Sequence, residues 1–140
     1  NSYWNVYFPV QEFTEGFFIC VEGEKDVNTL ISLGYSSFTF PTYSEGEIKY
    51  GLNKLLELDR FKGVIILNDN DLTGLQKAKT VEYYCSEFKI PYKFVDISNL
   101  IDFYKVESKR GMDITDIINC TRIQNLDDYF KRNSRTSIKV

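Results

Sequence analysis

Short apolar runs along the chain alternate with longer stretches in which apolar residues recur every three or four positions. A run such as "FFICV" is apolar throughout, which is typical of a strand buried on both faces of a sheet. The longer stretches have the period of amphipathic helices. We predict strands at residues 17–21, 37–41, 63–67 and 92–97, and helices at 25–33, 46–61 and 72–88.

Strands that alternate with helices in this way are typical of βαβ units and a parallel sheet. The predicted fold class is therefore α/β, a compact Rossmann-like fold of about four mainly parallel strands flanked by helices on both faces. Gly34 is expected to end the first helix, because glycine readily adopts the left-handed conformation found there. We expect the last 40 residues to form a loop that contains "GMDITDII" and an amphipathic helix through "IQNLDDYFKR".

A length of 140 residues suits one main domain with short additions. We assign residues 1–14 to a linker or flanking segment, 15–120 to the main domain, and 121–140 to a C-terminal amphipathic helix and basic tail. The chain lacks an initiator Met, so we expect it to be a piece of a longer protein. Its apolar runs fall far short of the ~20 residues that cross a bilayer, which predicts a soluble protein without a membrane partner.

Composition excludes several kinds of chemistry. The chain has no histidine, which excludes Ser-His and Cys-His triads, imidazole bases and histidine-bound metals. Its three cysteines are scattered, which argues against a disulfide framework or a cysteine zinc site and favours a reducing cytoplasm. A net charge of −3 gives no overall attraction to nucleic acid, although basic residues gather locally.

Two predicted strands run directly into acidic residues. Asp69 and Asp71 follow the third strand, and Glu22 follows the first, with Asp26 in the next helical turn. Ligands of open α/β sheets bind outside the carboxyl ends of the strands, where these acids are expected to lie. Residues two apart in an extended segment point the same way, so Asp69 and Asp71 suit one Mg²⁺ ion. Alternatively, either aspartate only caps the helix that follows.

A third acidic group, Asp113 and Asp116, lies beside Lys109 and Arg110. Taken alone, this group is typical of a helix start with a capping aspartate. Lys25, Lys109 and Arg110 are candidates for contacts with phosphates or a nucleic-acid backbone, with plain surface residues as the alternative.

Three segments together resemble the TOPRIM domain shared by topoisomerases, bacterial-type primases and related nucleases. They are "FFICVEGEKDVNTLISLGY", "GVIILNDNDLTGLQKA" and "GMDITDII". The resemblance covers roughly residues 15 to 118 and is closest to the primase and primase-helicase branch of phages and other mobile elements. That branch has a first motif similar to E-G-x-x-D and a second similar to D-x-D-x-x-G, and both occur here without gaps.

The resemblance implies that the main domain is catalytic and that acidic residues bind Mg²⁺ or Mn²⁺. Glu22 matches the family's general acid or base, and Asp69 and Asp71 match the acidic pair that takes part in catalysis with it. The expected metal ligands are Glu22, Asp26, Asp69, Asp71 and Asp113.

The third motif departs from the primase pattern, in which two acids lie two residues apart after a glycine. This chain has Asp113, Thr115 and Asp116 instead, which leaves open whether one metal ion binds or two. The implied activity is nucleotidyl transfer that synthesises primers on a DNA template from nucleoside triphosphates, with a helicase module in the same or a partner chain. A zinc module that reads template is not encoded in these residues, and neither is a G-x-x-x-x-G-K-[ST] motif.

Other functions remain as alternatives. A TOPRIM-type nuclease, or a scaffold that binds nucleic acid without turnover, fits the same motifs, because fold alone does not decide activity. The segment "DNDLT" also fits the start of haloacid-dehalogenase-like phosphatases. Only 69 residues follow Asp71, however, which is too few for the remaining motifs of those enzymes.

Overall fold

The structure is a computed structural model that describes residues 16–69, 71–109, 112–121, 126, 128 and 129. Within these residues four strands form one sheet: β1 (Phe17–Cys20), β2 (Ser37–Phe38), β3 (Gly63–Ile66) and β4 (Tyr92–Phe94). The order across the sheet is β2-β1-β3-β4, and each pair of neighbours is parallel. The predicted α/β fold class with a parallel sheet is confirmed.

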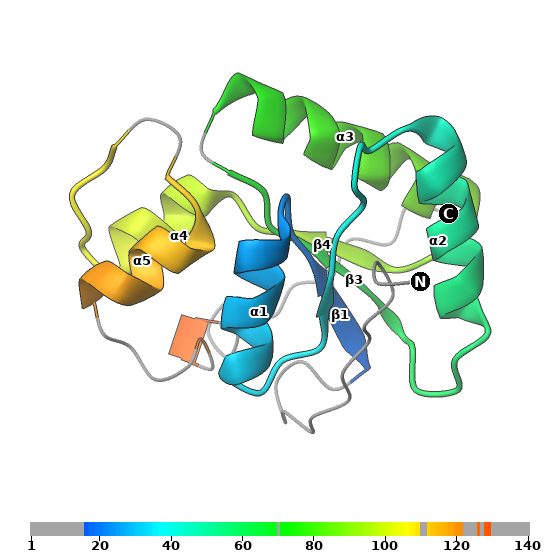
Figure 1. The fold of residues 1–140 in the computed structure, drawn as a ribbon, viewed down its shortest axis with the longest axis horizontal. Coiled ribbons are helices and arrows are strands. Elements are labelled where there is room, and N and C mark those ends of the chain that lie inside the picture. The colour runs from blue at the N-terminus through cyan, green and yellow to red at the C-terminus, as the bar shows by residue number, and fades with distance from the viewer. Residues whose placement is uncertain (1–15, 70, 110–111, 122–125, 127, 130–140) are drawn as a thin grey trace.

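Helices cover both faces of this sheet, as Figure 1 shows. In chain order the described helices are α1 (Glu24–Ser32), α2 (Glu45–Leu56), α3 (Leu72–Glu87), α4 (Ile97–Phe103) and α5 (Ile114–Thr121). Helices α2 and α3 pack on one face through a core that includes Phe18, Val64, Ile66, Leu52 and Val81. Helices α1, α4 and α5 pack on the other through Ile19, Ile65, Leu30, Leu100 and Ile117. Alternate residues of β1 and β3 thus pack in the cores on opposite faces of the sheet, which explains why these strands are apolar throughout.

The strand order places a topological switch point between β1 and β3. The chain leaves β1 through α1 to reach β2 on one side, and then crosses back through α2 to β3 on the other side of β1. The connections after β1 and β3 therefore diverge at the carboxyl edge of the sheet and open a crevice between them. Sheets of this type bind their ligands in that crevice.

Local sequence signals account for several element boundaries. Gly34 follows α1 with φ of 97°, as the sequence predicts for a glycine that ends a helix. Ser44 caps the start of α2 by accepting a hydrogen bond from the Glu47 N–H at 3.3 Å. Helix α2 ends at Leu56, which is earlier than the predicted residue 61, and the chain continues in turns to β3.

Two predictions for the second half of the chain had different outcomes. The fourth strand was expected to reach residue 97, but β4 ends at Phe94, because Asp96 accepts the Ser98 N–H at 2.9 Å and starts α4. The segment with "GMDITDII" was expected to lie in a loop region and, from its aspartates alone, to start a helix with a capping aspartate; the helix start is confirmed, because α5 begins at Ile114 and Asp113 accepts the Asp116 N–H. Its isoleucines at 114, 117 and 118 recur at helical spacing and are buried, which stabilises this short helix against the core.

Several predictions fall on residues outside the described part of the chain. These include the linker at 1–14, Arg110, and nearly all of the C-terminal helix and tail at 121–140. Of that last segment, Leu126 and Tyr129 pack in the core on the α1 side, and the Leu126 N–H donates to the Tyr35 hydroxyl at 2.8 Å.

Candidate metal centre

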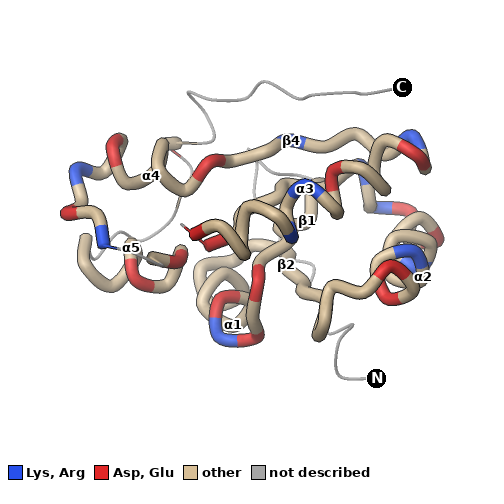
Figure 2. The backbone as a smooth tube through the Cα atoms, turned by 90° about the horizontal axis from the view of Figure 1, so that it is seen from above, with Lys and Arg blue, Asp and Glu red and all other residues tan. Residues whose placement is uncertain are grey.

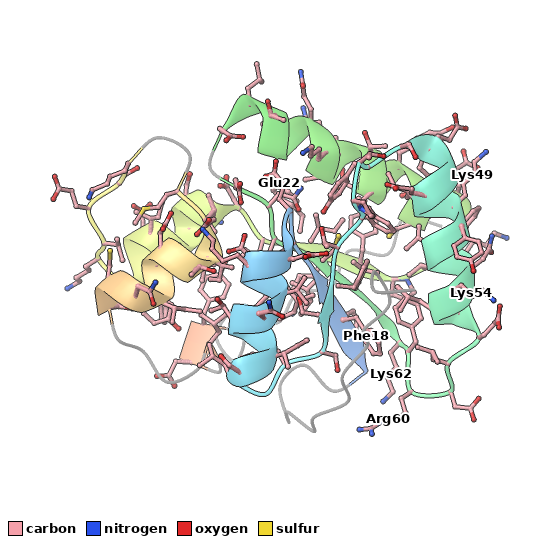
Figure 3. All side chains as sticks on the ribbon, viewed as in Figure 1. Phe18, Glu22, Lys49, Lys54, Arg60 and Lys62 are labelled. Atoms are coloured by element: carbon pink, nitrogen blue, oxygen red, sulfur yellow. The ribbon has the colours of Figure 1, made fainter. Side chains whose placement is uncertain are left out.

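The two strand ends at the switch point bring Glu22 and Asp69 together. Glu22 follows β1, Asp69 follows β3, and the backbone N–H of Asp69 donates a hydrogen bond to Glu22 Oε2 at 3.3 Å. Figure 3 shows Glu22 at the tip of β1, below α3. The expectation that these two strand ends are neighbours is confirmed by the parallel pairing of β1 with β3.

Three aspartates from separate parts of the chain converge beside this contact. Asp26 lies in the first turn of α1, Asp69 follows β3, and Asp113 precedes α5. One carboxylate oxygen of each lies within 4.8 Å of the other two. Figure 2, which marks acidic positions along the backbone, shows such positions on α1, on α5 and near the start of α3. We refer to Asp26, Asp69 and Asp113 as the acidic triad.

Asp26 is held by a threonine from the far end of the chain. The residue is only 4% exposed, and Thr115 Oγ1 donates a hydrogen bond to its Oδ1 at 2.5 Å. Thr115 also contacts Thr29 of α1, with their hydroxyl oxygens 2.9 Å apart. Sequence reasoning noted Thr115 only as a departure from a motif, whereas the structure makes it the residue that positions Asp26.

Asp113 both caps α5 and faces the triad. Its Oδ1 accepts the Asp116 N–H at 2.8 Å, and Asp116 Oδ2 accepts the Asp113 N–H at 3.1 Å, a reciprocal capping arrangement. Its Oδ2 forms an ion pair with Lys25 Nζ at 2.9 Å. The capping role that the sequence suggested for Asp113 is therefore present, together with membership of the triad.

Asp71 has a different place from the one that the D-x-D spacing suggests. Its side chain is the N-cap of α3 and accepts the Gly74 N–H at 2.6 Å. The residue is exposed, and it is not a member of the acidic triad. Its position matches the alternative interpretation, in which an aspartate after β3 caps the next helix.

The burial and crowding of these acidic side chains raise the pKa values of Asp69 and Asp26. Burial raises the pKa of Asp69 to about 8, and the carboxylate of Glu22 beside it adds to that shift. The negative charges of Asp26 and Asp113 act in the same direction. Burial also raises the pKa of Asp26, although the hydrogen bond from Thr115 opposes this. The site therefore favours protons or other cations, because like charges at short distance in a partly buried site repel one another strongly.

Two lysines flank the acids. Lys25, a predicted phosphate contact, pairs with Asp113, and its side chain is 65% exposed. Lys77 of α3 was not singled out from the sequence, but its Nζ lies 3.1 Å from Glu22 Oε1 and 5.4 Å from the centre of the Tyr43 ring. No local pattern in the sequence singles it out, because its contact with Glu22 spans 55 positions of the chain. Lys109 is exposed in the segment between α4 and α5.

The donor set fits a hard divalent cation. All the converging donors are carboxylate oxygens, which Mg²⁺ and Mn²⁺ prefer, and the chain has no histidine that would favour zinc. The triad would supply three ligands to such an ion, with Glu22 beside it.

Close packing of α3 against the site depends on Gly74. A Cβ at this position would lie 2.5 Å from the Asp69 carbonyl oxygen and 3.0 Å from Glu22 Oε2. We expect Gly74→Ala to lower the free energy of unfolding by about 1–3 kcal/mol, because the backbone that carries Asp69 has to move. Urea denaturation measures the change.

The matched control is Gly46→Ala on α2, where a Cβ meets no described atom within 4 Å. This variant is expected to gain about 0.5–1 kcal/mol from helix propensity. Equal stability of Gly74→Ala and the wild type would contradict the close approach of α3 to Asp69.

None of the helices that the structure describes has the length and apolar character to span a lipid bilayer.

Comparison with known proteins adds no family assignment. No protein-family model, curated protein or solved structure significantly matches the chain.

Proposed function

We propose that this chain is a metal-dependent nucleotidyl-transfer domain of the TOPRIM type, from a DNA primase or primase-helicase. The observation that carries the proposal is the acidic triad beside Glu22 at the switch point of a parallel sheet. This is the edge where sheets of this kind bind ligands. The motifs E-G-x-x-D and D-x-D-x-x-G supply Glu22, Asp26 and Asp69 of this group.

The acidic triad would hold Mg²⁺ or Mn²⁺. A bound divalent ion would neutralise the charge that develops on phosphate oxygens during transfer. Thr115 keeps the Asp26 carboxylate turned toward the site, and the capping bond to Asp116 fixes Asp113. These contacts pre-organise the ligands, so that less ordering is needed when the ion binds.

Glu22 is suited to handling the proton of the attacking hydroxyl. Its Oε1 faces Lys77 and its Oε2 accepts the Asp69 N–H, which fixes the carboxylate beside the triad. With no histidine in the chain, a carboxylate is the side chain available for proton transfer at this site. Lys25 and Lys77 place positive charge at the rim, where triphosphate or nucleic-acid backbone would approach.

The proposed substrates are nucleoside triphosphates and a DNA template, and the proposed partner is a helicase module in the same or another chain. Lys109 and Arg110 are proposed to contact nucleic acid. We also propose a cytoplasmic location, since Cys20, Cys85 and Cys120 are free thiols that suit a reducing compartment.

The metal site is tested by titrating Mn²⁺ into the wild type and two variants, with binding followed by calorimetry. We expect Asp69→Asn to weaken Mn²⁺ binding at least about tenfold, because it removes one charged ligand of the triad. Asp71→Asn makes the same change in charge two residues away and keeps the helix cap, since asparagine caps as well as aspartate. It is expected to bind Mn²⁺ as the wild type does.

An equal loss in both variants would instead support one ion shared by Asp69 and Asp71, as the spacing of the motif suggests. Unchanged binding in both would contradict the metal site itself.

A further inference from the structure

Three large apolar side chains are exposed together at the carboxyl edge of the sheet. Leu72 and Leu75 at the start of α3 are 71% and 41% exposed, and Phe94 at the end of β4 is 37% exposed. All three line one crevice of about 350 Å³, between α3 and the segment that joins β4 to α4. Single exposed apolar residues are ordinary, but a group of them that lines a hollow is typical of a docking surface.

The charges around this crevice indicate which kind of segment it fits. Its charged lining residues are Asp69, Asp71 and Asp96, and none of the lining residues is basic. Asp71 and Asp96 are exposed, and neither forms an ion pair with another described residue. An acidic rim around apolar walls favours a basic segment that also carries apolar side chains.

The chain contains a segment of this composition. Residues 130–140, with the sequence "FKRNSRTSIKV", carry four basic side chains, no acidic one, and a Phe, an Ile and a Val. They form most of the basic tail that the sequence distinguishes, and they lie outside the described part of the chain. Neither the acidic triad nor the proposed nucleotidyl transfer makes use of this tail.

The tail starts close to the crevice. Tyr129, the residue before it, packs on α4, with its ring centre 5.4 Å from that of Phe103. Burial raises the pKa of the Tyr129 phenol, a hydrogen bond with Asn99 opposes this shift, and the charge of Asp96 adds to it. Asp96 and Ser98 on either side of the start of α4 line the crevice. Residues 130–140 can span up to about 36 Å when extended, so the whole crevice is within their reach.

We propose that residues 130–140 dock in this crevice. Their apolar side chains cover Leu72, Leu75 and Phe94, and their basic side chains lie beside Asp71 and Asp96. Docking removes exposed apolar surface from water and offsets the negative charge of the rim. The contact goes beyond the proposed function and does not depend on it, because neither Asp71 nor Asp96 belongs to the acidic triad.

The test locates the tail in the whole chain with a nitroxide spin label. The label is attached to Ser137→Cys in a chain that also carries Cys120→Ser, since Cys120 is exposed whereas Cys20 and Cys85 are buried. We expect the amide NMR signals of the residues that line the crevice to lose most of their intensity, and to recover when the nitroxide is reduced. Signals of residues 57–62, which precede β3 at the opposite edge of the sheet, should keep their intensity.

Two variants of the crevice separate docking from mere proximity. Asp71→Asn/Asp96→Asn removes the acidic rim and keeps both helix caps, since asparagine caps as well as aspartate. We expect the ratio of docked to free tail to fall roughly fivefold, because exposed ion pairs each contribute modestly. Leu72→Ala/Leu75→Ala removes the apolar walls in a helix that alanine favours, and it should lower the ratio at least as much.

Glu57→Gln/Asp59→Asn is the matched control. It makes the same change in charge at two exposed positions before β3, away from the crevice, and should leave the loss of signal unchanged. All spectra are recorded in EDTA, so the result is independent of the metal site.

Full intensity of the crevice signals in the spin-labelled chain would overturn the inference, as would a loss of signal that persists in both crevice variants. The source of the tail is tested by mixing spin-labelled chain with an isotope-labelled chain that carries no nitroxide. Signals of the isotope-labelled chain that stay sharp in this mixture support a contact within one chain. Their broadening would show that the tail of a second copy occupies the crevice, and it would overturn the contact proposed here.

Discussion

Glu22→Gln is expected to lose at least about 100-fold in the initial rate of metal-dependent nucleotidyl transfer, the usual size of a general acid or base contribution. Glutamine keeps the shape of the side chain and an oxygen that can accept the Asp69 N–H, but it cannot take up a proton. The fold should be retained, because the substitution also removes one charge from a crowded acidic site. Primer synthesis on single-stranded DNA and nicking of duplex DNA are measured in parallel with Mg²⁺.

Glu24→Gln is the matched control. Glu24 lies two residues away at the start of α1, is exposed, and is not part of the triad, so its substitution makes the same change in charge outside the site. We expect it to keep wild-type rates. The assays use this chain and any longer natural protein that contains it, since priming can require further domains.

The two assays also separate the alternatives. Loss of primer synthesis in Glu22→Gln supports the primase proposal, and nicking without primer synthesis in the wild type supports a nuclease. Activity that persists equally in both variants would remove Glu22 from the mechanism and favour a scaffold that binds nucleic acid without turnover.

The centre of the sheet could be predicted from the sequence because β1 and β3 are short and have no polar side chains. Residues of β1 and β3 face cores on both sides, so no polar position interrupts them, and each strand ends where acidic residues begin. Once strands and helices alternate, handedness and the parallel arrangement follow from general rules of chain connection. The neighbouring positions of Glu22 and Asp69 could be predicted for the same reason.

The role of Asp71 could not be predicted from strand geometry. The expectation that Asp69 and Asp71 point the same way assumes an extended strand through both residues, but β3 ends at Ile66. Asp71 still has an extended backbone, but it is the N-cap of α3, which begins at Leu72, and its side chain accepts the N–H of Gly74. The orientation of this carboxylate is therefore set by its hydrogen bond to the first turn of the helix, where backbone N–H groups have no partner within the helix.

The remaining parts of the site depend on contacts between distant residues. Thr115 meets Asp26 across 89 positions of sequence, and Lys77 meets Glu22 across 55. Neither pairing leaves a local pattern, because the spacing reflects the packing of α5 on α1 and of α3 over the sheet. Sequence motifs thus indicated which acids matter, and tertiary packing decided which of them meet.

Stability of the metal-free chain is expected to fall as the pH rises from about 5 toward about 8. The pKa of Asp69 is raised from 3.8 to about 8 in the folded chain, so between these values the folded state holds a proton that the unfolded state lacks. The free energy of unfolding then decreases with rising pH and levels off above the folded pKa. The chain has no histidine, so no imidazole titrates in the same window. Melting curves in EDTA measure the trend, and Asp69→Asn should flatten it.

Binding of Mg²⁺ should show the opposite trend, because the ion competes with the proton that Asp69 holds. Below the folded pKa of about 8, we expect the affinity for Mg²⁺ to decrease roughly tenfold for each unit by which the pH is lowered. Above that pKa, the affinity should no longer change with pH. Calorimetry at several pH values, in buffers of different ionisation enthalpy, gives both the affinity and the number of protons released. Release of about one proton per ion near neutral pH is the expected result. The contradicting result is an affinity that does not change with pH between about 6 and 8, with no proton release. It would mean that Asp69 is already ionised in the free protein. The repulsion among the acidic side chains would then be offset without a metal.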